Sequence, residues 1–302
     1  MGLADPAPDE VDIHDLGMRL PEGKHLRLPG RGTTYLRAVE GPPDAPTVLL
    51  IHGWLASGGL NWVLCFEPLQ AHFNVLAPDM RGHGRGIRSR RRFRLADCAD
   101  DIAEMLERLG TGPVIVVGYS MGGPIAQLLW RRHPELVDGM VLIATGCEFV
   151  PGNRERYALA AIASVAAGTT QVGAIASWAP AFITRRLFGM ELSRANPGAV
   201  SKWAREEMSH HSIRVIFEAV QSLATYSSKH WISEVDVPTS VIITETDRAV
   251  SPEAQLRLAM SIQDAHINRI HDGHTACINR DFGRKVTNAC IDVATRLGEI
   301  NQ

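Results

Sequence analysis

The sequence predicts an α/β fold, in which helices flank a mostly parallel eight-stranded sheet and a helical cap is inserted into the core. Short apolar runs bounded by glycine, proline or aspartate alternate with segments of helical spacing, as is typical of a parallel sheet. This alternation stops between about residues 147 and 232, where the chain is alanine-rich and has no strand-like run. The content of 45% hydrophobic and 21% charged residues is that of a globular protein.

Eight apolar runs are expected to form the strands. They are residues 25–29, 33–40, 46–53, 73–79, 113–120, 139–146, 238–246 and 267–272. A glycine turn joins the first two. Helical spacing of apolar residues predicts a helix over 97–109. A second helix is expected over 124–136, with Pro124 in its first turn, where a missing N–H group costs nothing.

These patterns divide the chain into four segments. We expect a flexible tail at 1–20, the first part of the core at 21–146, a helical cap at 147–232 and the second part of the core at 233–302. The N-terminus is acidic and lacks the apolar stretch of a secretory signal. Five scattered cysteines, without a C-x-x-C pair, predict free thiols in a reducing compartment. The sequence therefore predicts a cytoplasmic protein, either a monomer or a homodimer.

The charge of the chain does not indicate binding to a nucleic acid or a membrane. The net charge of −2 gives no reason to expect a nucleic acid. Seven arginines do crowd residues 81–94, but the acidic residues within 97–104 are expected to neutralise them and leave a solvated loop face. An anionic partner at this loop is the alternative. Residues 157–184 carry no charge, yet their alanine, glycine and proline favour packed cap helices over a membrane span, with peripheral membrane contact left open.

A serine between two glycines joins a predicted strand to a predicted helix, in the stretch Gly118-Tyr119-Ser120-Met121-Gly122. A sharp turn from strand to helix strains the residue at its apex, and glycines on either side avoid clashes there. The helix that follows points unpaired N–H groups at the apex, where they would stabilise a negative charge. Because G-x-S-x-G also arises by chance, it is this context that favours a nucleophile at Ser120 over a structural serine.

A serine nucleophile needs a base and an acid that orients the base, and at such a turn the chain order is Ser, then Asp or Glu, then His. His274 is the predicted base because it lies in the loop beyond the last strand, whereas His271 is expected to end that strand. Asp247 follows the preceding strand and is the predicted acid, with Glu245 as its nearest rival. Two histidines without further ligands do not indicate a metal site, so no metal or cofactor is expected.

Attack on a carbonyl creates a negative oxygen that two N–H donors must hold. The backbone of Met121 is the predicted source of one donor. Trp54 is the predicted source of the other, because His52-Gly53-Trp54 opens the loop after a buried strand. Loss of one such donor typically costs about 3 kcal/mol of transition-state stabilisation.

Together these pieces resemble the α/β-hydrolase fold superfamily. The matching motifs, in the family's order and within about residues 25–300, are HGW (52–54), DMRGHGRG (79–86), GYSMGG (118–123), TETDRAVSP (244–252) and DGH (272–274). The resemblance assigns the family's nucleophile, acid and base to Ser120, Asp247 and His274. The chain departs from the family at Thr244, where glycine is usual.

The resemblance also narrows the chemistry. Branches that open epoxides or remove halides use an aspartate nucleophile, and Ser120 argues against both. The chain is also similar to the cofactor-free branch known as non-haem haloperoxidases or perhydrolases, although Leu55 stands where that branch tends to have proline. The DMRGHG motif is expected to be structural, with Gly82 and Gly84 permitting a tight loop.

The predicted function is hydrolysis of a small to medium apolar carboxylic ester through an acyl-enzyme, by Ser120, His274 and Asp247. Perhydrolase or haloperoxidase activity and carbon–carbon bond hydrolysis on the same residues are the enzymatic alternatives. A ligand-binding protein without turnover is the alternative from another class. Large side chains of the cap are expected to line an acyl pocket or to pack the cap on the core: Trp178, Phe182, Leu187, Phe188, Trp203 and Phe217.

Overall fold

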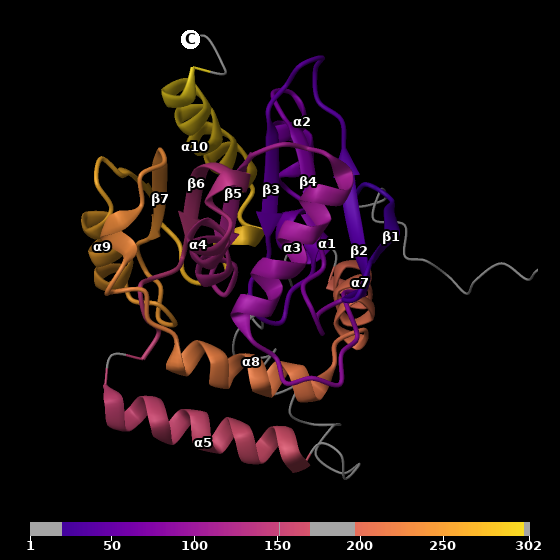
Figure 1. Cartoon of the computed structure of the whole chain (residues 1–302), viewed down its shortest axis with the longest axis vertical. Coiled ribbons are helices and arrows are strands. Elements are labelled where there is room, and N and C mark those ends of the chain that lie inside the picture. The colour runs from indigo at the N-terminus through magenta and orange to yellow at the C-terminus, as the bar shows by residue number, and fades with distance from the viewer. Residues whose placement is uncertain (1–19, 151, 170–196, 299–302) are drawn as a thin grey trace, which may run out of the picture.

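The computed structural model describes residues 20–150, 152–169 and 197–298 of the chain. At its centre is an eight-stranded sheet with the strand order β1-β2-β4-β3-β5-β6-β7-β8 (Figure 1). The strands are β1 (Gly23–Leu28), β2 (Gly32–Val39), β3 (Thr47–Ile51), β4 (Asn74–Pro78), β5 (Val114–Tyr119), β6 (Val137–Ile143), β7 (Thr239–Thr244) and β8 (His266–Ile270). Every predicted strand is confirmed, with ends shifted by up to three residues.

The sheet is parallel except at one edge. β1 and β2 form an antiparallel hairpin, and β2 is antiparallel to β4. All other neighbouring strands run parallel. Parallel strands covered on both faces read as continuous apolar runs, and every residue of β5 is buried. Because the carboxyl ends of parallel strands meet at one edge of the sheet, the loops after β5, β7 and β8 come together there.

Alternating residues of the central strands point into two separate apolar cores. Leu49 and Val116 belong to the core that includes residues of α3 (Leu95–Leu109), α4 (Gly122–Arg132) and α9 (Pro252–Ser261). Leu50 and Val117 belong to the core on the opposite face, with residues of α1 (Gly58–Trp62), α2 (Phe66–Gln70) and α10 (Phe282–Leu297). The sheet is therefore sandwiched between helices, as the predicted fold class requires.

The two predicted core helices are confirmed, but one is shorter than expected. α3 ends where Gly110 adopts a left-handed conformation with φ +64°. α4 ends at Arg132 instead of continuing to Leu136. Pro134 cannot donate the hydrogen bond that would extend α4, and it begins the short 3₁₀ turn η2 (Pro134–Leu136) instead.

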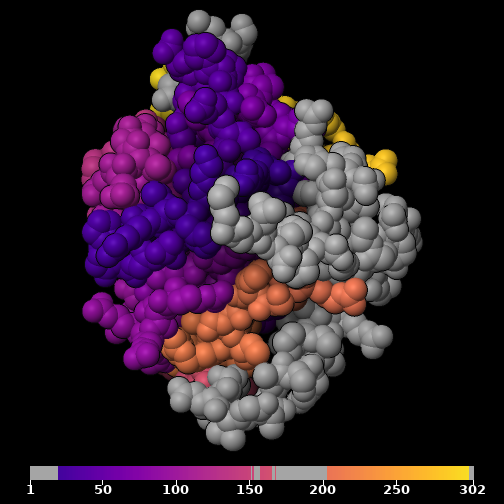
Figure 2. Space-filling view, turned by 90° about the vertical axis from the view of Figure 1, so that its right-hand side faces the viewer, coloured from indigo at the N-terminus to yellow at the C-terminus, as the bar shows by residue number. Residues whose placement is uncertain are grey.

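The cap lies between β6 and β7, and its described part consists of α5 (Asn153–Thr169), α7 (Pro197–Ser209) and α8 (Ile213–Thr225), without a strand. α5 packs on α8, which lies between α5 and the core (Figure 1). Figure 2 shows the orange cap helices in contact with the purple part of the core. The expected tail at 1–20 lies outside the described residues except for Leu20, as do residues 170–184 of the uncharged segment. Among the helices described, none combines the length and the apolar character needed to span a bilayer.

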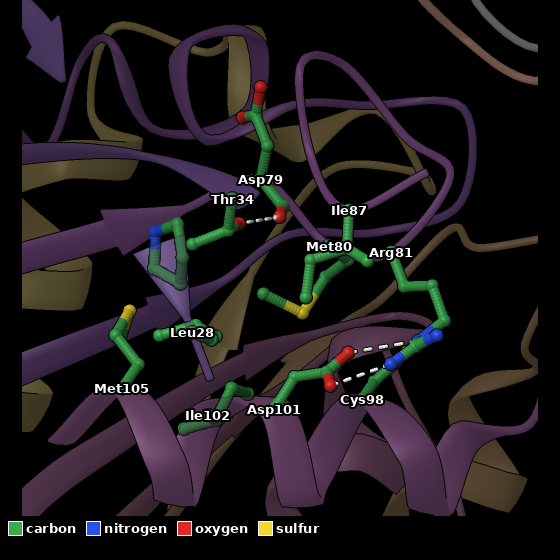
Figure 3. Close-up of a pocket in the computed structure, with 11 residues that line it drawn as sticks. Leu28, Thr34, Asp79, Met80, Arg81, Ile87, Cys98, Asp101, Ile102 and Met105 are labelled. Carbon is green, nitrogen blue, oxygen red and sulfur yellow. Dashed lines mark hydrogen bonds and ion pairs between the residues drawn. The ribbon is translucent and has the colours of Figure 1, made fainter. Parts of the chain in front are cut away.

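The arginine-rich loop is only partly neutralised. Arg81 forms two hydrogen bonds to Asp101, at 2.9 and 2.6 Å (Figure 3), as the predicted neutralisation requires. Asp100, in contrast, binds Arg132 on α4. Five exposed arginines of this loop make no ion pair within the described part of the chain, namely Arg88, Arg90, Arg91, Arg92 and Arg94. The acidic residues of α3 therefore balance only part of this stretch, and its exposed arginines lie on a solvated loop face, as we expected.

Candidate active site

Ser120 occupies the turn between β5 and α4 in a strained conformation. Its φ of +51° lies in the left-handed region, which residues with a side chain seldom adopt. The Ser120 N–H donates to the carbonyl of Ile143 on β6 at 2.9 Å. The Ser120 carbonyl accepts from the Gly123 N–H at 2.9 Å and from the Thr145 hydroxyl at 3.0 Å. Two backbone groups and the Thr145 hydroxyl therefore hold the strained apex in place.

The flanking glycines are required by close backbone approach. A Cβ on Gly118 would lie 2.5 Å from the carbonyl oxygen of Gly122. A Cβ on Gly122 would lie 2.1 Å from the carbonyl oxygen of Ile51 on β3. Because no side chain fits at either position, the turn can be this tight only with glycine there.

His274 connects Ser120 to Asp247. Its Nε2 lies 2.8 Å from the Ser120 hydroxyl, and its Nδ1 lies 2.8 Å from Oδ2 of Asp247. The Tyr119 hydroxyl donates to the His274 carbonyl at 2.7 Å, which ties the histidine loop to the end of β5. The three predicted residues thus form one continuous hydrogen-bonded chain, although they are far apart in the sequence.

The side chain of Asp247 is fully buried and accepts several hydrogen bonds. Oδ1 accepts from the N–H groups of Ala249 and Val250, at 2.8 and 3.0 Å. Oδ2 accepts from the Thr244 hydroxyl at 2.8 Å as well as from His274. Burial alone would raise the pKa of the Asp247 carboxyl, but these hydrogen bonds, with that from His274 foremost, lower it below its usual value. The carboxylate is therefore ionised at neutral pH and orients the imidazole.

The two acidic residues nearest to Asp247 and His274 in the sequence make other contacts. Glu245 pairs with the exposed His271 at 3.1 Å and with Arg269 at 3.7 Å. Asp272 accepts from the Gly273 N–H at 2.6 Å. The structure therefore brings Asp247, and neither neighbouring acid, to the imidazole of His274.

The loop that begins with His52 passes beside Ser120. A Cβ on Gly53 would lie 3.4 Å from Cβ of Ser120. The Gly53 N–H donates to Oδ1 of Asn61 at 2.9 Å, and the Gly53 carbonyl lies 2.8 Å from Nδ1 of His52. The Gly53 carbonyl and the Trp54 N–H belong to one trans peptide and point to opposite sides of it. The Trp54 N–H is therefore turned away from His52.

His52 is a structural residue of this loop. Burial lowers its pKa to about 4, so the imidazole is neutral at neutral pH. Its Nε2 accepts from the Met80 N–H at 2.9 Å, so its Nδ1 carries the proton that the Gly53 carbonyl accepts. The imidazole thus fixes the tilt of the peptide that contains the Trp54 N–H.

Met121 is fully buried directly before α4, next to Ser120 in the chain. The N–H groups at the start of a helix lack partners within that helix, which is the reason that the motif predicts a donor from Met121. The two predicted backbone donors, from Met121 and Trp54, therefore lie in the two segments that adjoin Ser120.

A buried carboxylate that no sequence pattern singles out connects the cap to the loop that follows His52. Glu207 on α7 accepts from the Ser57 hydroxyl at 2.6 Å. Arg85 donates to the other oxygen of Glu207, and Arg37 lies 3.6 Å from it. Burial alone would raise the pKa of Glu207, but the hydroxyl and the two arginines lower it. The Trp54 indole N–H adds a hydrogen bond of 2.9 Å to the Ile216 carbonyl on α8.

The DMRGHG motif contacts the cap as well, and its role is structural. Gly82 has φ +72°, and a Cβ there would lie 2.3 Å from Val215 on α8. Gly84 has φ +46°, and a Cβ there would lie 2.3 Å from Oδ2 of Asp79. Both glycines are thus required by backbone conformation and by the space beside them. Of the large cap side chains, Trp203 is buried and Phe217 half-buried, whereas the others named above lie outside the described residues.

Figure 3 shows a pocket that is separate from this site. It lies between β1, β2, the loop after β4 and α3, and it is lined by Leu28, Thr34, Pro78, Asp79, Met80, Arg81, Ile87, Cys98, Asp101, Ile102 and Met105. None of the predicted catalytic residues lines it. In the described part of the chain, no three His, Cys, Asp or Glu side chains gather as a metal site. All five cysteines are free and buried.

The chain belongs to the α/β hydrolase fold family, since the profile of that family matches residues 46–281. Three mycobacterial proteins of uncharacterised function, from Mycobacterium bovis and two strains of Mycobacterium tuberculosis, are 33% identical to it over 112 residues. The match covers 37% of this chain and spans about a third, 33%, of the length of those proteins.

Longer matches are found to proteins of named activity. The pimeloyl-[acyl-carrier protein] methyl ester esterase of Chromobacterium violaceum is 28% identical over 227 residues, which cover 75% of this chain and 86% of that protein. A solved hydrolase from Pseudomonas aeruginosa superimposes with a TM-score of 0.74 at 21% identity, over 91% of this chain and 98% of that one. At that identity the structural likeness establishes the fold.

Proposed function

We propose that the protein is a serine esterase that cleaves a small to medium apolar carboxylic ester. The observation that carries the proposal is the unbroken chain from the Ser120 hydroxyl through His274 to Asp247, with 2.8 Å at each link. A serine hydroxyl becomes nucleophilic when a positioned base accepts its proton, and this geometry supplies the base and its orienting acid.

In the proposed reaction, the Ser120 hydroxyl attacks the ester carbonyl while Nε2 of His274 takes its proton. Asp247 holds the imidazole with its proton on Nδ1 and stabilises the imidazolium that forms. The N–H groups of Met121 and Trp54 hold the negative oxygen of the tetrahedral intermediate. The imidazolium then gives its proton to the departing alcohol, which leaves an acyl group on Ser120. Water, activated by the same imidazole, releases the acid and restores the serine.

Relatives support the ester as the substrate class. The Chromobacterium relative is named a methyl ester esterase, and a second relative, from Ectopseudomonas oleovorans, is named a poly(3-hydroxyalkanoate) depolymerase. The second is 28% identical over 245 residues, which cover 80% of this chain and 82% of that protein. A third, named epoxide hydrolase B, matches over only 40% of this chain. Ser120 in place of an aspartate nucleophile favours ester cleavage over epoxide opening.

The test is a chain-length series of p-nitrophenyl esters, from acetyl to decanoyl, with the wild type and Ser120→Ala. We expect the highest kcat/KM at a short to medium acyl chain, and a loss of kcat by roughly 10⁴-fold or more in the variant. Equal rates in the two proteins would refute the proposal. Peroxide-dependent halogenation in carboxylate buffer, without ester turnover, would favour the perhydrolase alternative instead.

A further inference from the structure

We propose that Thr244 and Gln255 are positioning residues for this reaction, because together they fix the Asp247 carboxylate and direct a second hydrogen-bond donor at the oxygen that holds His274. The inference rests on the proposed function. Both side chains are fully buried beside the acid, on β7 and α9. Neither would touch the substrate, so each would act only through Asp247.

The backbone fixes which way the Gln255 amide faces. Its Oε1 accepts from the Thr244 N–H at 3.0 Å, and its Nε2 donates to the Val250 carbonyl at 2.8 Å. An N–H group needs an acceptor and a carbonyl needs a donor, so the reversed amide would lose both hydrogen bonds. The orientation of this side chain therefore follows from two main-chain groups.

The orientation of the amide in turn determines the direction in which the Thr244 hydroxyl points its proton. Nε2 of Gln255 also lies 2.8 Å from Oγ1 of Thr244, and this contact makes the hydroxyl an acceptor there. The hydroxyl proton must then point elsewhere, and Oδ2 of Asp247 lies 2.8 Å away. Thr244 is thus a donor to the carboxylate. The Gln255 amide itself lies 3.3 Å from the same oxygen.

This donor competes with the imidazole for one carboxylate oxygen. Oδ2 of Asp247 accepts from Thr244 and from His274, while Oδ1 is held by two backbone N–H groups. The carboxylate cannot rotate without losing hydrogen bonds on both sides. A hydroxyl that shares the charge of Oδ2 also weakens its attraction for the imidazolium. A glycine at position 244, which is usual among the hydrolases that this chain resembles, could not supply the donor.

Three ionisable side chains of the described structure lie around the imidazole of His274 or beside Tyr119, namely Tyr119, Cys277 and Asp247, and the pKa of each is shifted away from neutral pH. The Tyr119 ring centroid lies 6.0 Å from that of His274, and burial raises the pKa of Tyr119 well above its usual value. Cys277 lies three residues beyond His274 and interacts with Tyr119, and burial raises its pKa to about 12. The pKa of Asp247 is lowered. A change in the acid limb of a reactivity profile would therefore not come from these three groups.

The experiment measures the second-order rate constant for labelling of Ser120 by a fluorophosphonate probe as a function of pH. Thr244→Val keeps the shape of the side chain but removes the hydroxyl. Without the hydroxyl, Oδ2 of Asp247 attracts the imidazolium more strongly. The acid limb of the profile should therefore move to higher pH by roughly half a pH unit, which is equivalent in free energy to one modest hydrogen bond. Labelling at the optimum should also slow several-fold, because the carboxylate is less firmly held.

Two variants serve as controls. Thr244→Ser restores a hydroxyl and should restore the wild-type profile. Thr239→Val removes another buried hydroxyl of β7, which donates to the Val237 carbonyl at 3.0 Å, far from the acid along the strand. This variant should lose stability without moving the profile. A merely structural role for Thr244 would make both valine variants behave alike.

The outcomes separate this inference from the proposed function. A folded Thr244→Val protein with the wild-type profile would overturn the inference and leave the esterase proposal intact. If Thr244→Val does not fold, Gln255→Met takes its place. This variant leaves the Thr244 hydroxyl free to rotate, so we expect a smaller shift of the acid limb in the same direction. An unchanged profile there would likewise overturn the inference. A wild type that is not labelled at Ser120 would overturn both.

Discussion

Oδ2 of Asp247 lies 2.8 Å from Nδ1 of His274, and the aspartate side chain has no exposed surface. A buried carboxylate at this distance holds the imidazole in one tautomer, with the proton on Nδ1 and the lone pair on Nε2. Nε2 faces Ser120 at 2.8 Å. This one contact therefore determines whether the imidazole can accept the serine proton.

Asp247→Asn should reduce kcat for a p-nitrophenyl ester by about 10⁴-fold at neutral pH, because an amide N–H would face Nδ1 and favour the wrong tautomer. KM should change little, since the carboxylate does not touch the substrate. Glu245→Gln is the matched control, because Glu245 pairs with His271 and Arg269 outside the hydrogen-bonded chain. A loss of activity in the control but not in Asp247→Asn would show that the acid is misassigned.

Gly122→Ala should destabilise the protein strongly, because the new Cβ would lie 2.1 Å from the Ile51 carbonyl oxygen. We expect a loss of about 3 kcal/mol in the free energy of unfolding, or no folded protein, since overpacking against backbone cannot relax easily. Urea denaturation measures the effect. Gly110→Ala is the control, because its φ is +64° but nothing lies within 4 Å of the added atom, so only about 1 kcal/mol of backbone strain is expected. Equal losses would contradict the steric argument.

The fold and the residues that meet at the proposed site could be predicted because strands and tight turns leave patterns in the sequence. Buried parallel strands are continuous apolar runs, and the glycines at 118 and 122 mark the tight turn at Ser120. The predicted end of α4 was wrong by four residues. Apolar spacing continues to Leu136, but Pro134 cannot donate the hydrogen bond that would extend the helix. The sequence could rank Asp247 above Glu245 only by position in the loop. The structure decides between them, because Asp247 contacts His274 whereas Glu245 contacts His271.

Glu207→Gln should weaken the contact between the cap and the core at neutral pH. Removing one charge from a buried ion pair costs roughly 3 kcal/mol, and Glu207 faces Arg85 and Arg37. The folded state lowers the pKa of Glu207, so its ionised form contributes stability above the unfolded value of about 4.3, and this contribution is lost as the pH falls through the lower folded value. The stability difference between the two proteins should therefore be largest at neutral pH and shrink in acid.

Urea denaturation at neutral and at acidic pH measures this difference. Glu206→Gln changes the adjacent residue of α7, which is only half-buried, and should have little effect at either pH. A deficit in Glu207→Gln that persists unchanged in strong acid would show that lost packing, and not lost charge, is responsible.

Glu207 and Gln255 could not have been found from the sequence. Both are polar residues on helices, where a polar residue is ordinarily a solvent-facing one. What makes them different is tertiary: α7 is placed so that Glu207 meets Ser57 and Arg85, and α9 is placed so that Gln255 meets two main-chain groups of the acid loop. Only Thr244 left a signal, as the departure from the glycine usual in related hydrolases, and its hydrogen bond to Asp247 gives that departure a physical reason.

The most direct test of Ser120 as the nucleophile is peptide mass spectrometry after reaction with a fluorophosphonate probe, on the wild type and on Ser120→Ala. We expect one adduct per chain, on the peptide that contains Ser120, and none in the variant. An adduct on another serine, or an unlabelled wild type that is folded, would contradict the claim that this strained turn presents an activated nucleophile.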